Sequence, residues 1–361
     1  MRLLDFYIAR HVIGSFLVVL LVIVGLDMIF ALIEEMKDIR NDYDFAAAVE
    51  FIMMTGPRRL YDYTPLSSLI GCLIGLGLLA SSSELTVMRA AGISTMQIIT
   101  SVMKPVAAII IGTMLIGEYV VPVSEPKAQS DRQVKITGGG RLNDASRVWH
   151  RDEMTFIHIN AVSSDGSIRG VTRYEFNDDL TLARSSFARS GHYESGLWEL
   201  RKIEETRFPE SGVEGIDAQS LQTGTIKKER WQSGLTPELL KVVMVKPDHL
   251  SIAGLFDYSN YLDDQGLASA QYRVALWKKI LLPFAILGLV LIAVSFIFGP
   301  LRSVTVGQRL VTGVVIGLAF KLTQDVLGPT SSVFGFAPLL AVCFPILICF
   351  GFGFWLLRKA R

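Results

Sequence analysis

One polar segment, residues 123–261, divides this chain into two hydrophobic arms. Each arm holds three apolar runs, and roughly 20 such residues in a helix can cross a hydrocarbon core of about 30 Å. The runs cover residues 12–33, 66–80 (extended by 61–65), 96–121, 274–298, 304–327 and 333–357. This three–insert–three plan predicts an α-helical membrane protein with six transmembrane helices (3+3) and one inserted domain.

Composition and missing motifs exclude several functions. The net charge of +1 gives no basic field for nucleic acid. The three cysteines, Cys72, Cys343 and Cys349, all lie in apolar runs, so the insert has neither a disulfide nor a cysteine metal site. The sequence contains no phosphate-binding loop of the G-x-x-x-x-G-K-[ST] type and no H-E-x-x-H. We therefore expect no enzyme and no bound cofactor or metal.

The charges of the short loops predict the orientation. Six spans put both termini on one side, and Lys and Arg favour the cytoplasmic side. The loop at 328–338 has no Lys or Arg, whereas Arg58, Arg59, Lys278 and Lys279 oppose the assignment. With the termini inside, the cytoplasmic side holds Arg2, Arg10, Arg89, Arg302, Arg309, Arg358, Lys359 and Arg361. The balance favours cytoplasmic termini and an insert outside the cytoplasm.

The insert has the pattern of short β-strands. Residues 154–162 and 198–208 are candidate strands, and Ile157 and Ile159 would share a face. In the strand at 168–176, alternation places Ile168 with Thr172 and Tyr174, opposite Val171 and Arg173. Strands at this spacing predict a sandwich or jellyroll. The expected domains are 1–123 (helices 1–3), 124–262 (an all-β jellyroll) and 263–361 (helices 4–6).

The loop between spans two and three predicts a short helix at about 82–92. Ser81 with Glu84 matches a capping box, Gly92 is a stop signal, and Ser94 with Gln97 repeats the box. Leu85 and Met88 would share one face of the helix. The helix either rests on lipid or docks a cytoplasmic partner, and this pattern favours neither.

For the other polar residues and the small residues of the spans, the sequence supports two interpretations each. Cations near the outer ends of spans one and three either bind anionic lipid groups or form a solvated rim; they are Lys37, Arg40, Lys127 and Arg132. Ionisable groups in the spans are expected to face the interior, and Lys321 can pair with Asp325; the others are Asp27 and Glu118. Two G-x-x-x-G pairs serve packing within the chain or a second subunit: Gly71 with Gly75, and Gly313 with Gly317.

Nearly the whole chain resembles the LptF/LptG family, the permease subunits of the lipopolysaccharide-export ABC transporter. The resemblance rests on the three–insert–three plan and on the stretch 83–92, Ser-Glu-Leu-Thr-Val-Met-Arg-Ala-Ala-Gly. Two more stretches resemble the LptG branch: Pro-Asp-His-Leu-Ser-Ile-Ala-Gly-Leu at 247–255 and Ser-Phe-Ile-Phe-Gly-Pro-Leu-Arg-Ser at 295–303.

The resemblance implies a partner set and a location. Such a subunit pairs with LptF in the inner membrane of a Gram-negative bacterium, and two LptB ATPase subunits bind the ATP. Its periplasmic jellyroll passes lipopolysaccharide, taken from the outer leaflet, through LptC to the LptA bridge. The loop helix would sit in a groove of the ATPase; its coupling residues are Glu84, Leu85, Met88 and Arg89.

The resemblance also implies a substrate path between span one of one subunit and span five of the other. Lys37 and Arg132 match family positions that contact lipid A phosphates, while Asp38 stands where a second lysine is usual, and Arg40 compensates. The expected apolar lining is Phe16, Leu20, Ile23 and Phe30 on span one and Leu318 and Phe320 on span five. Rival hypotheses are a permease for another lipid, a structural or signalling protein without an ATPase, and a membrane hydrolase.

Overall fold

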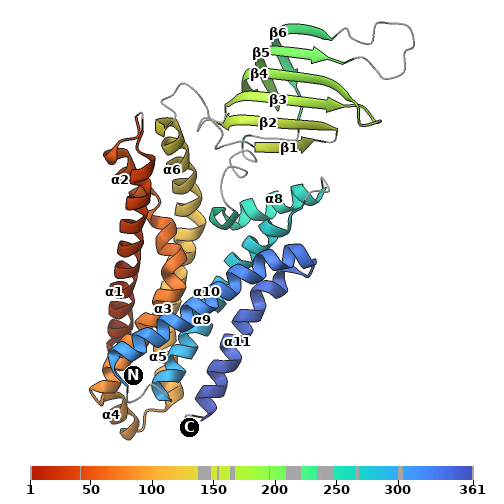
Figure 1. The fold of residues 1–361 in the computed structure, drawn as a ribbon. Coiled ribbons are helices and arrows are strands. Elements are labelled where there is room, and N and C mark those ends of the chain that lie inside the picture. The colour runs from red at the N-terminus through yellow and green to blue at the C-terminus, as the bar shows by residue number, and fades with distance from the viewer. Residues whose placement is uncertain are drawn as a thin grey trace.

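The protein is a bundle of long helices with a β-sheet at one end (Figure 1). Both termini and the short helix α4 lie at the end of the bundle away from the sheet. The computed structural model describes residues 2–40, 42–136, 148–152, 154–162, 167–194, 196–208, 221–233, 237, 247–264, 268–299 and 304–359. Residues 300–303 of the family stretch at 295–303 lie outside them.

Among the described residues, six helices are long and apolar enough to cross a membrane, as predicted. They are α1 (Arg2–Glu35), α3 (Gly56–Ser81), α5 (Thr95–Leu115) with its continuation, α9 (Ala270–Phe298), α10 (Val306–Phe334) and α11 (Pro338–Lys359). The third span continues through a π-helical turn, η2 (Ile116–Val120), into α6 (Val121–Ile136). The expected boundary at 123/124 therefore falls inside one continuous helix.

Shorter helices connect the spans. They are η1 (Met36–Asp38), α2 (Phe45–Met54), α4 (Glu84–Ala90), η3 (Pro247–His249) and α8 (Ile252–Asp264). The predicted spans do not include α2, whose start Asp44 caps by accepting a hydrogen bond from the Ala47 amide at 2.8 Å. The predicted loop at 328–338 was too long, because α10 continues to Phe334 and ends at Gly335, whose φ is +71°.

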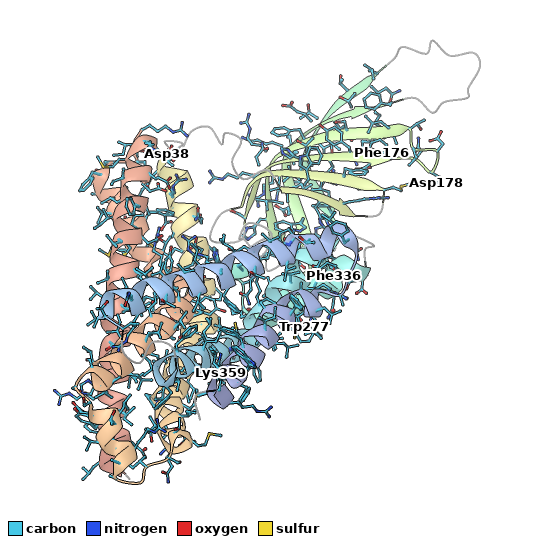
Figure 2. All side chains as sticks on the ribbon, turned by 60° about the horizontal axis from the view of Figure 1, so that its bottom comes forward. Asp38, Phe176, Asp178, Trp277, Phe336 and Lys359 are labelled. Carbon is cyan, nitrogen blue, oxygen red and sulfur yellow. The ribbon has the colours of Figure 1, made fainter. Side chains whose placement is uncertain are left out.

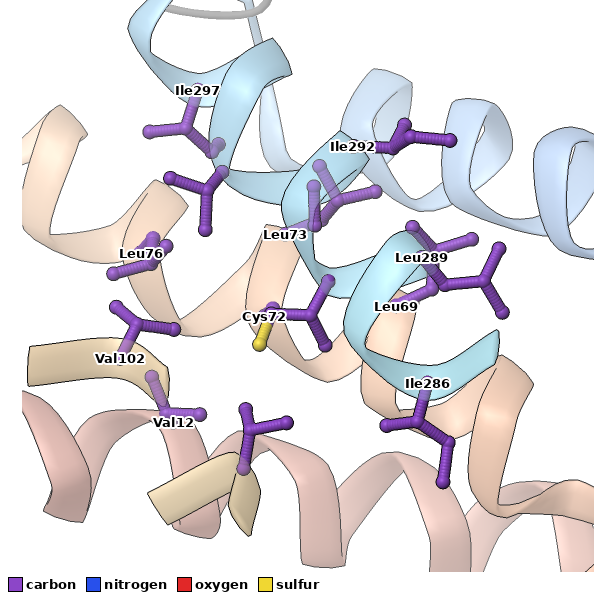
Figure 3. Close-up of a cluster of buried hydrophobic side chains, with 14 of the residues drawn as sticks. Val12, Leu69, Cys72, Leu73, Leu76, Val102, Ile286, Leu289, Ile292 and Ile297 are labelled. Carbon is purple, nitrogen blue, oxygen red and sulfur yellow. The ribbon is translucent and has the colours of Figure 1, made fainter. Parts of the chain in front are cut away.

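Helices α3 and α9 form the centre of the bundle. In their most apolar windows 67% and 61% of residues are buried, against 17% in α1 and 11% in α10. Figure 3 shows the core, in which α3 side chains pack against those of α1, α5 and α9. They include Val12, Leu69, Cys72, Leu73, Leu76, Val102, Ile286 and Leu289. Helices α1 and α10 thus lie at the edge of the bundle, where one face of each contributes to the core and the other is uncovered.

Glycines allow α1 and α10 to approach α3 closely. A Cβ on Gly71 would lie 2.6 Å from the Phe16 Cα, and one on Gly75 would lie 2.9 Å from the His11 oxygen. On α10, a Cβ on Gly313 or Gly317 would overlap leucine side chains of α3. Both G-x-x-x-G pairs therefore serve packing within the chain.

In the described part of the insert, six antiparallel strands form one sheet, in the order of the sequence. They are β1 (Val148–Asp152), β2 (Thr155–Val162), β3 (Ile168–Phe176), β4 (Leu182–Glu194), β5 (Leu197–Arg207) and β6 (Gln222–Trp231). The predicted six-span membrane protein with an inserted all-β domain is confirmed. Figure 2 shows that Phe176, at the end of β3, lies at the end of the sheet away from Asp38 of the helix bundle.

One predicted face assignment in the insert was wrong. Gly170 has a φ of +63°, and the register is the same on either side of it, in the pairs Ile159–Val171 and Ala161–Arg169. This left-handed residue breaks the alternation of side chains along β3 without adding a residue to the strand. Ile168 and Val171 are consequently both buried, together with Ile157 and Ile159 as expected.

Candidate functional site

Helices α1 and α10 carry uncovered stripes of large apolar side chains. On α10, Val311, Val315, Leu318 and Leu322 recur at the spacing of one helix face and are 50–60% exposed. The stripe of α1 comprises Leu17, Val18, Leu21, Val22, Leu26, Ile29, Phe30 and Ile33. In a membrane protein such faces are covered by lipid or by another subunit.

The structure separates the predicted lining residues into two groups. Phe30 and Leu318 lie on the uncovered stripes, and Ile23 is half-buried. Phe16 and Leu20 were assigned wrongly, because they pack inside the chain against Leu60, Tyr63 and Ile109. Phe320 is likewise buried in the core with Leu69 and Leu289.

Of the four cations predicted near the outer ends of spans one and three, three are exposed and one is already paired with carboxylates. Lys37, Arg40 and Lys127 are exposed. Arg132, on α6, donates hydrogen bonds to Glu35 at 2.8 Å and to Asp38 at 2.6 Å. Its guanidinium also lies over the rings of Tyr43 and Phe51, 5.8 and 5.4 Å from their centroids. An anion that binds Arg132 must therefore compete with two carboxylates.

Ionisable groups in the spans find partners within the chain, although not all as predicted, and Lys321 and Asp325 do so at exposed positions. Asp27 forms an ion pair with Arg59 and accepts a hydrogen bond from the Tyr63 hydroxyl at 2.7 Å. The expected pair of Lys321 with Asp325 is wrong. Asp325 lies 3.5 Å from Lys278 of α9, and the Lys321 ammonium lies over the Tyr63 ring at 5.3 Å.

A buried lysine joins the membrane helices to α8. Lys279 Nζ donates to the carbonyls of Gly117 at 2.6 Å and Leu250 at 2.5 Å, and lies 3.5 Å from Glu118. Glu118, in the π-helical turn, accepts a hydrogen bond from the Ile252 amide at the start of α8, at 2.9 Å. The charge pattern shows Lys279 only as a cation that opposes the predicted orientation; its position within the apolar run at 274–298 is the sequence signal for a buried role.

The sheet contacts α8 through a pair of aromatic side chains. The Tyr261 hydroxyl of α8 lies 2.9 Å from Nε2 of His150 on β1, and the two rings stack. With the lysine contacts, this pair makes a continuous connection from the membrane helices to the sheet.

The sheet has an apolar cluster beside a charged one. The apolar cluster is Ile157, Ile159, Ile168, Val171, Ala188, Trp198, Leu200 and Ile203. In the charged cluster, Glu229 accepts a hydrogen bond from the buried Arg173 at 2.6 Å and lies 3.2 Å from Arg184. Burial opposes ionisation of Glu229, but the two arginines outweigh it and hold its pKa below the usual value.

The cytoplasmic-loop helix α4 forms as expected, with a different start. Ser81 is the last residue of α3, and its hydroxyl donates to the Leu78 carbonyl at 2.8 Å, so the predicted Ser81–Glu84 capping box is wrong. Ser83, with a φ of +63°, precedes the helix. Gly92 ends it in a Schellman arrangement, and the Ser94–Gln97 box is confirmed.

The exposed face of α4 is not the one predicted. Leu85 is buried in the bundle core and Met88 packs against it. Val87, 65% exposed, and Arg89 point away from the core. Glu84 accepts hydrogen bonds from Tyr7 of α1 at 2.7 Å and Ser82 at 2.9 Å. These bonds, chiefly that from Tyr7, hold the pKa of Glu84 below its usual value.

Together these features define a multi-pass membrane subunit with uncovered apolar faces on α1 and α10, a surface helix beside the termini and an inserted β domain. The family model described as "Lipopolysaccharide export system permease LptF/LptG" matches residues 6–359. The chain belongs to this family, whose members are transporter subunits rather than enzymes.

Two relatives carry the name "Lipopolysaccharide export system permease protein LptG". The protein of Escherichia coli strain K12 is 33% identical over 99% of this chain and 98% of its own length. The protein of Haemophilus influenzae strain Rd is also 33% identical, over 99% of both chains. The similarity therefore covers both helical arms and the insert.

Proposed function

We propose that this chain takes lipopolysaccharide from the outer leaflet of the inner membrane and passes it toward a periplasmic bridge. ATP hydrolysis in a separate subunit supplies the energy, and the chain itself binds no cofactor. The supporting observation is that uncovered apolar faces on α1 and α10 occur in a bundle that is joined through Lys279 and α8 to a β-sheet. In the proposed orientation in the inner membrane, the termini and α4 are cytoplasmic and the sheet is periplasmic.

The two uncovered faces suit lateral passage of a lipid with several acyl chains. Exposing those chains to water costs about 25 cal/mol per Å² of apolar surface. In the proposed complex, α1 faces span five of the LptF partner, and α10 faces span one of the same partner. Each of these two interfaces therefore contains one apolar stripe of this chain. Phe30, Val315 and Leu318 would contact the acyl chains.

The rim cations would hold the phosphates of the lipid. Lys37 and Arg40 follow α1 and Lys127 lies on α6, and all three are exposed. The helix α6 lies nearer the sheet than α4 does (Figure 1). Arg132 would change partners, from Glu35 and Asp38 to phosphate, as the lipid arrives. A phosphate contact by an arginine with two oxygens at once is strong enough for such competition.

The α4 helix would receive the ATPase. Two LptB subunits would bind this chain and LptF, with the exposed Val87 of α4 at the contact. Glu84, held by Tyr7, would transmit movement of α4 to α1 rather than contact the ATPase freely. On the periplasmic side, LptC and LptA would continue the path from the sheet.

Co-purification of this chain with LptF and the ATPase tests the proposal. Val87→Glu places a charge on the exposed face of α4, and we expect the ATPase to be lost while LptF is retained. Glu84→Ala removes the contact with Tyr7, and we expect ATP hydrolysis to become uncoupled from export. Leu180→Glu, an exposed site at the opposite end of the protein, is the control. No association of wild-type protein with an ATPase would instead favour the structural-protein hypothesis.

A further inference from the structure

A pocket at the α4 end of the bundle lies apart from the proposed export faces. It lies between α5, α9 and α11 and has a volume of about 480 Å³, within the roughly 300–1,000 Å³ usual for small-molecule sites. None of its lining residues belongs to α1 or α10. The lining is apolar apart from two threonines and Arg358; it includes Met96, Ile99, Met103, Leu291, Phe350 and Leu357.

A second, polar pocket adjoins the first. It has a volume of about 360 Å³ and shares Thr95 and Met96 with the apolar one. Arg89 and the turn from Gly92 to Ser94 form its remaining walls. Neither pocket has a carboxylate among its described lining residues, so the polar end offers arginines and no acidic group. The combined shape is amphipathic, with one apolar and one cationic end.

The length of the apolar pocket indicates what kind of molecule it binds. On α5 the apolar lining extends from Thr95 to Met103, about 12 Å at 1.5 Å per residue. A partner helix that crosses the membrane needs a groove of about 30 Å. The pocket reaches only from the last turn of α11, with Arg358, into the nearer leaflet. This length suits an acyl chain of one leaflet.

We propose that this paired pocket is a binding site for an anionic phospholipid of the leaflet at the α4 end of the bundle. One acyl chain fills the space between α5, α9 and α11, and the headgroup lies between Arg358 and Arg89. Because the polar pocket includes the turn that joins α4 to α5, a bound lipid stabilises the position of α4. The site does not depend on export of lipopolysaccharide.

Native mass spectrometry of the full chain tests this proposal with phosphatidylglycerol and phosphatidylethanolamine of identical acyl chains. We expect preferential retention of phosphatidylglycerol. Arg358→Gln should weaken its retention about five-fold, the effect of one lost cation at an anionic lipid. Lys359→Gln is the matched control, because the Lys359 ammonium lies over the Trp355 ring at 5.4 Å and does not line the pocket.

A photoactivatable phosphatidylglycerol, with its reactive group on the acyl chain, locates the site. We expect crosslinks within residues 96–103 and 350–357, and their loss in Thr100→Trp, which fills the pocket from an exposed position. Equal retention of both lipids, an equal effect of the two cation substitutions, or crosslinks on other helices would each overturn the proposal. So would a crosslink from this pocket to a transmembrane helix of a co-purified protein.

Discussion

Gly71→Ala tests whether glycine sets the distance between α1 and α3. The added Cβ would lie 2.6 Å from the Phe16 Cα and 2.9 Å from the Phe16 nitrogen, whereas carbon atoms pack at about 3.5–4.0 Å. Both neighbours are backbone atoms, so no side-chain rotation relieves the overlap. The helices would have to move apart by about 1 Å.

Two opposing effects determine the size of the change. Alanine favours a helix interior over glycine by about 1 kcal/mol, while an overpacked core loses about 1–3 kcal/mol. Separation of α1 from α3 also loosens the contacts of the buried Phe16 and Leu20, so the upper part of that range applies. We expect Gly71→Ala to destabilise the chain by about 1–2 kcal/mol.

Gly14→Ala on α1 is the matched control, because a Cβ there meets nothing within 4 Å. Thermal unfolding of the purified chain in detergent, followed by circular dichroism, measures both variants. The Gly71 variant should melt below wild type, and the Gly14 variant at or above it. If Gly71→Ala is as stable as Gly14→Ala, close backbone approach does not fix this helix pair.

Two further predictions concern the sheet and its connection to the membrane helices. Lys279→Met leaves the Gly117 and Leu250 carbonyls and Glu118 without their buried cation, and should cost about 3–5 kcal/mol; limited proteolysis should cut near α8 earlier than in Lys278→Met. The contacts with Arg173 and Arg184 hold the pKa of Glu229 below 4.5 in the folded chain. They therefore contribute stability that is complete above about pH 4.5 and is lost as the pH falls through the lowered pKa of Glu229. Glu229→Gln should flatten this acid limb, measured by the fluorescence of Trp231, which lies under Arg173; an unchanged limb would contradict the assignment.

The six spans could be predicted from sequence because each depends on one local quantity, a run of apolar residues. Positions that depend on packing could not. Leu85 and Met88 share a face of α4, as periodicity required, but periodicity does not say whether that face meets the bundle or a partner. The same ambiguity placed Phe16, Leu20 and Phe320 in the substrate path, since apolar residues on a span face either lipid or protein.

Ion pairs between helices were also beyond local reasoning. Asp325 can reach Lys321 one turn away, and only the packing of α9 beside α10 brings Lys278 to it instead. The break in alternation at Gly170 was hidden because a pattern of alternating residues does not show that one of them has a positive φ. By contrast, the Ser94–Gln97 box and the Gly92 stop involve residues a few positions apart, and both formed as predicted.

Site-specific photocrosslinking to lipopolysaccharide in cells tests the central claim most directly. A photoreactive amino acid replaces Leu318 or Phe30 on the uncovered faces, with Phe344, an exposed residue of α11, as the control. The account predicts lipopolysaccharide adducts at Leu318 and Phe30 that accumulate when ATP hydrolysis is blocked, and none at Phe344. Equal labelling at all three positions, or adducts of another lipid alone, would contradict export along α1 and α10.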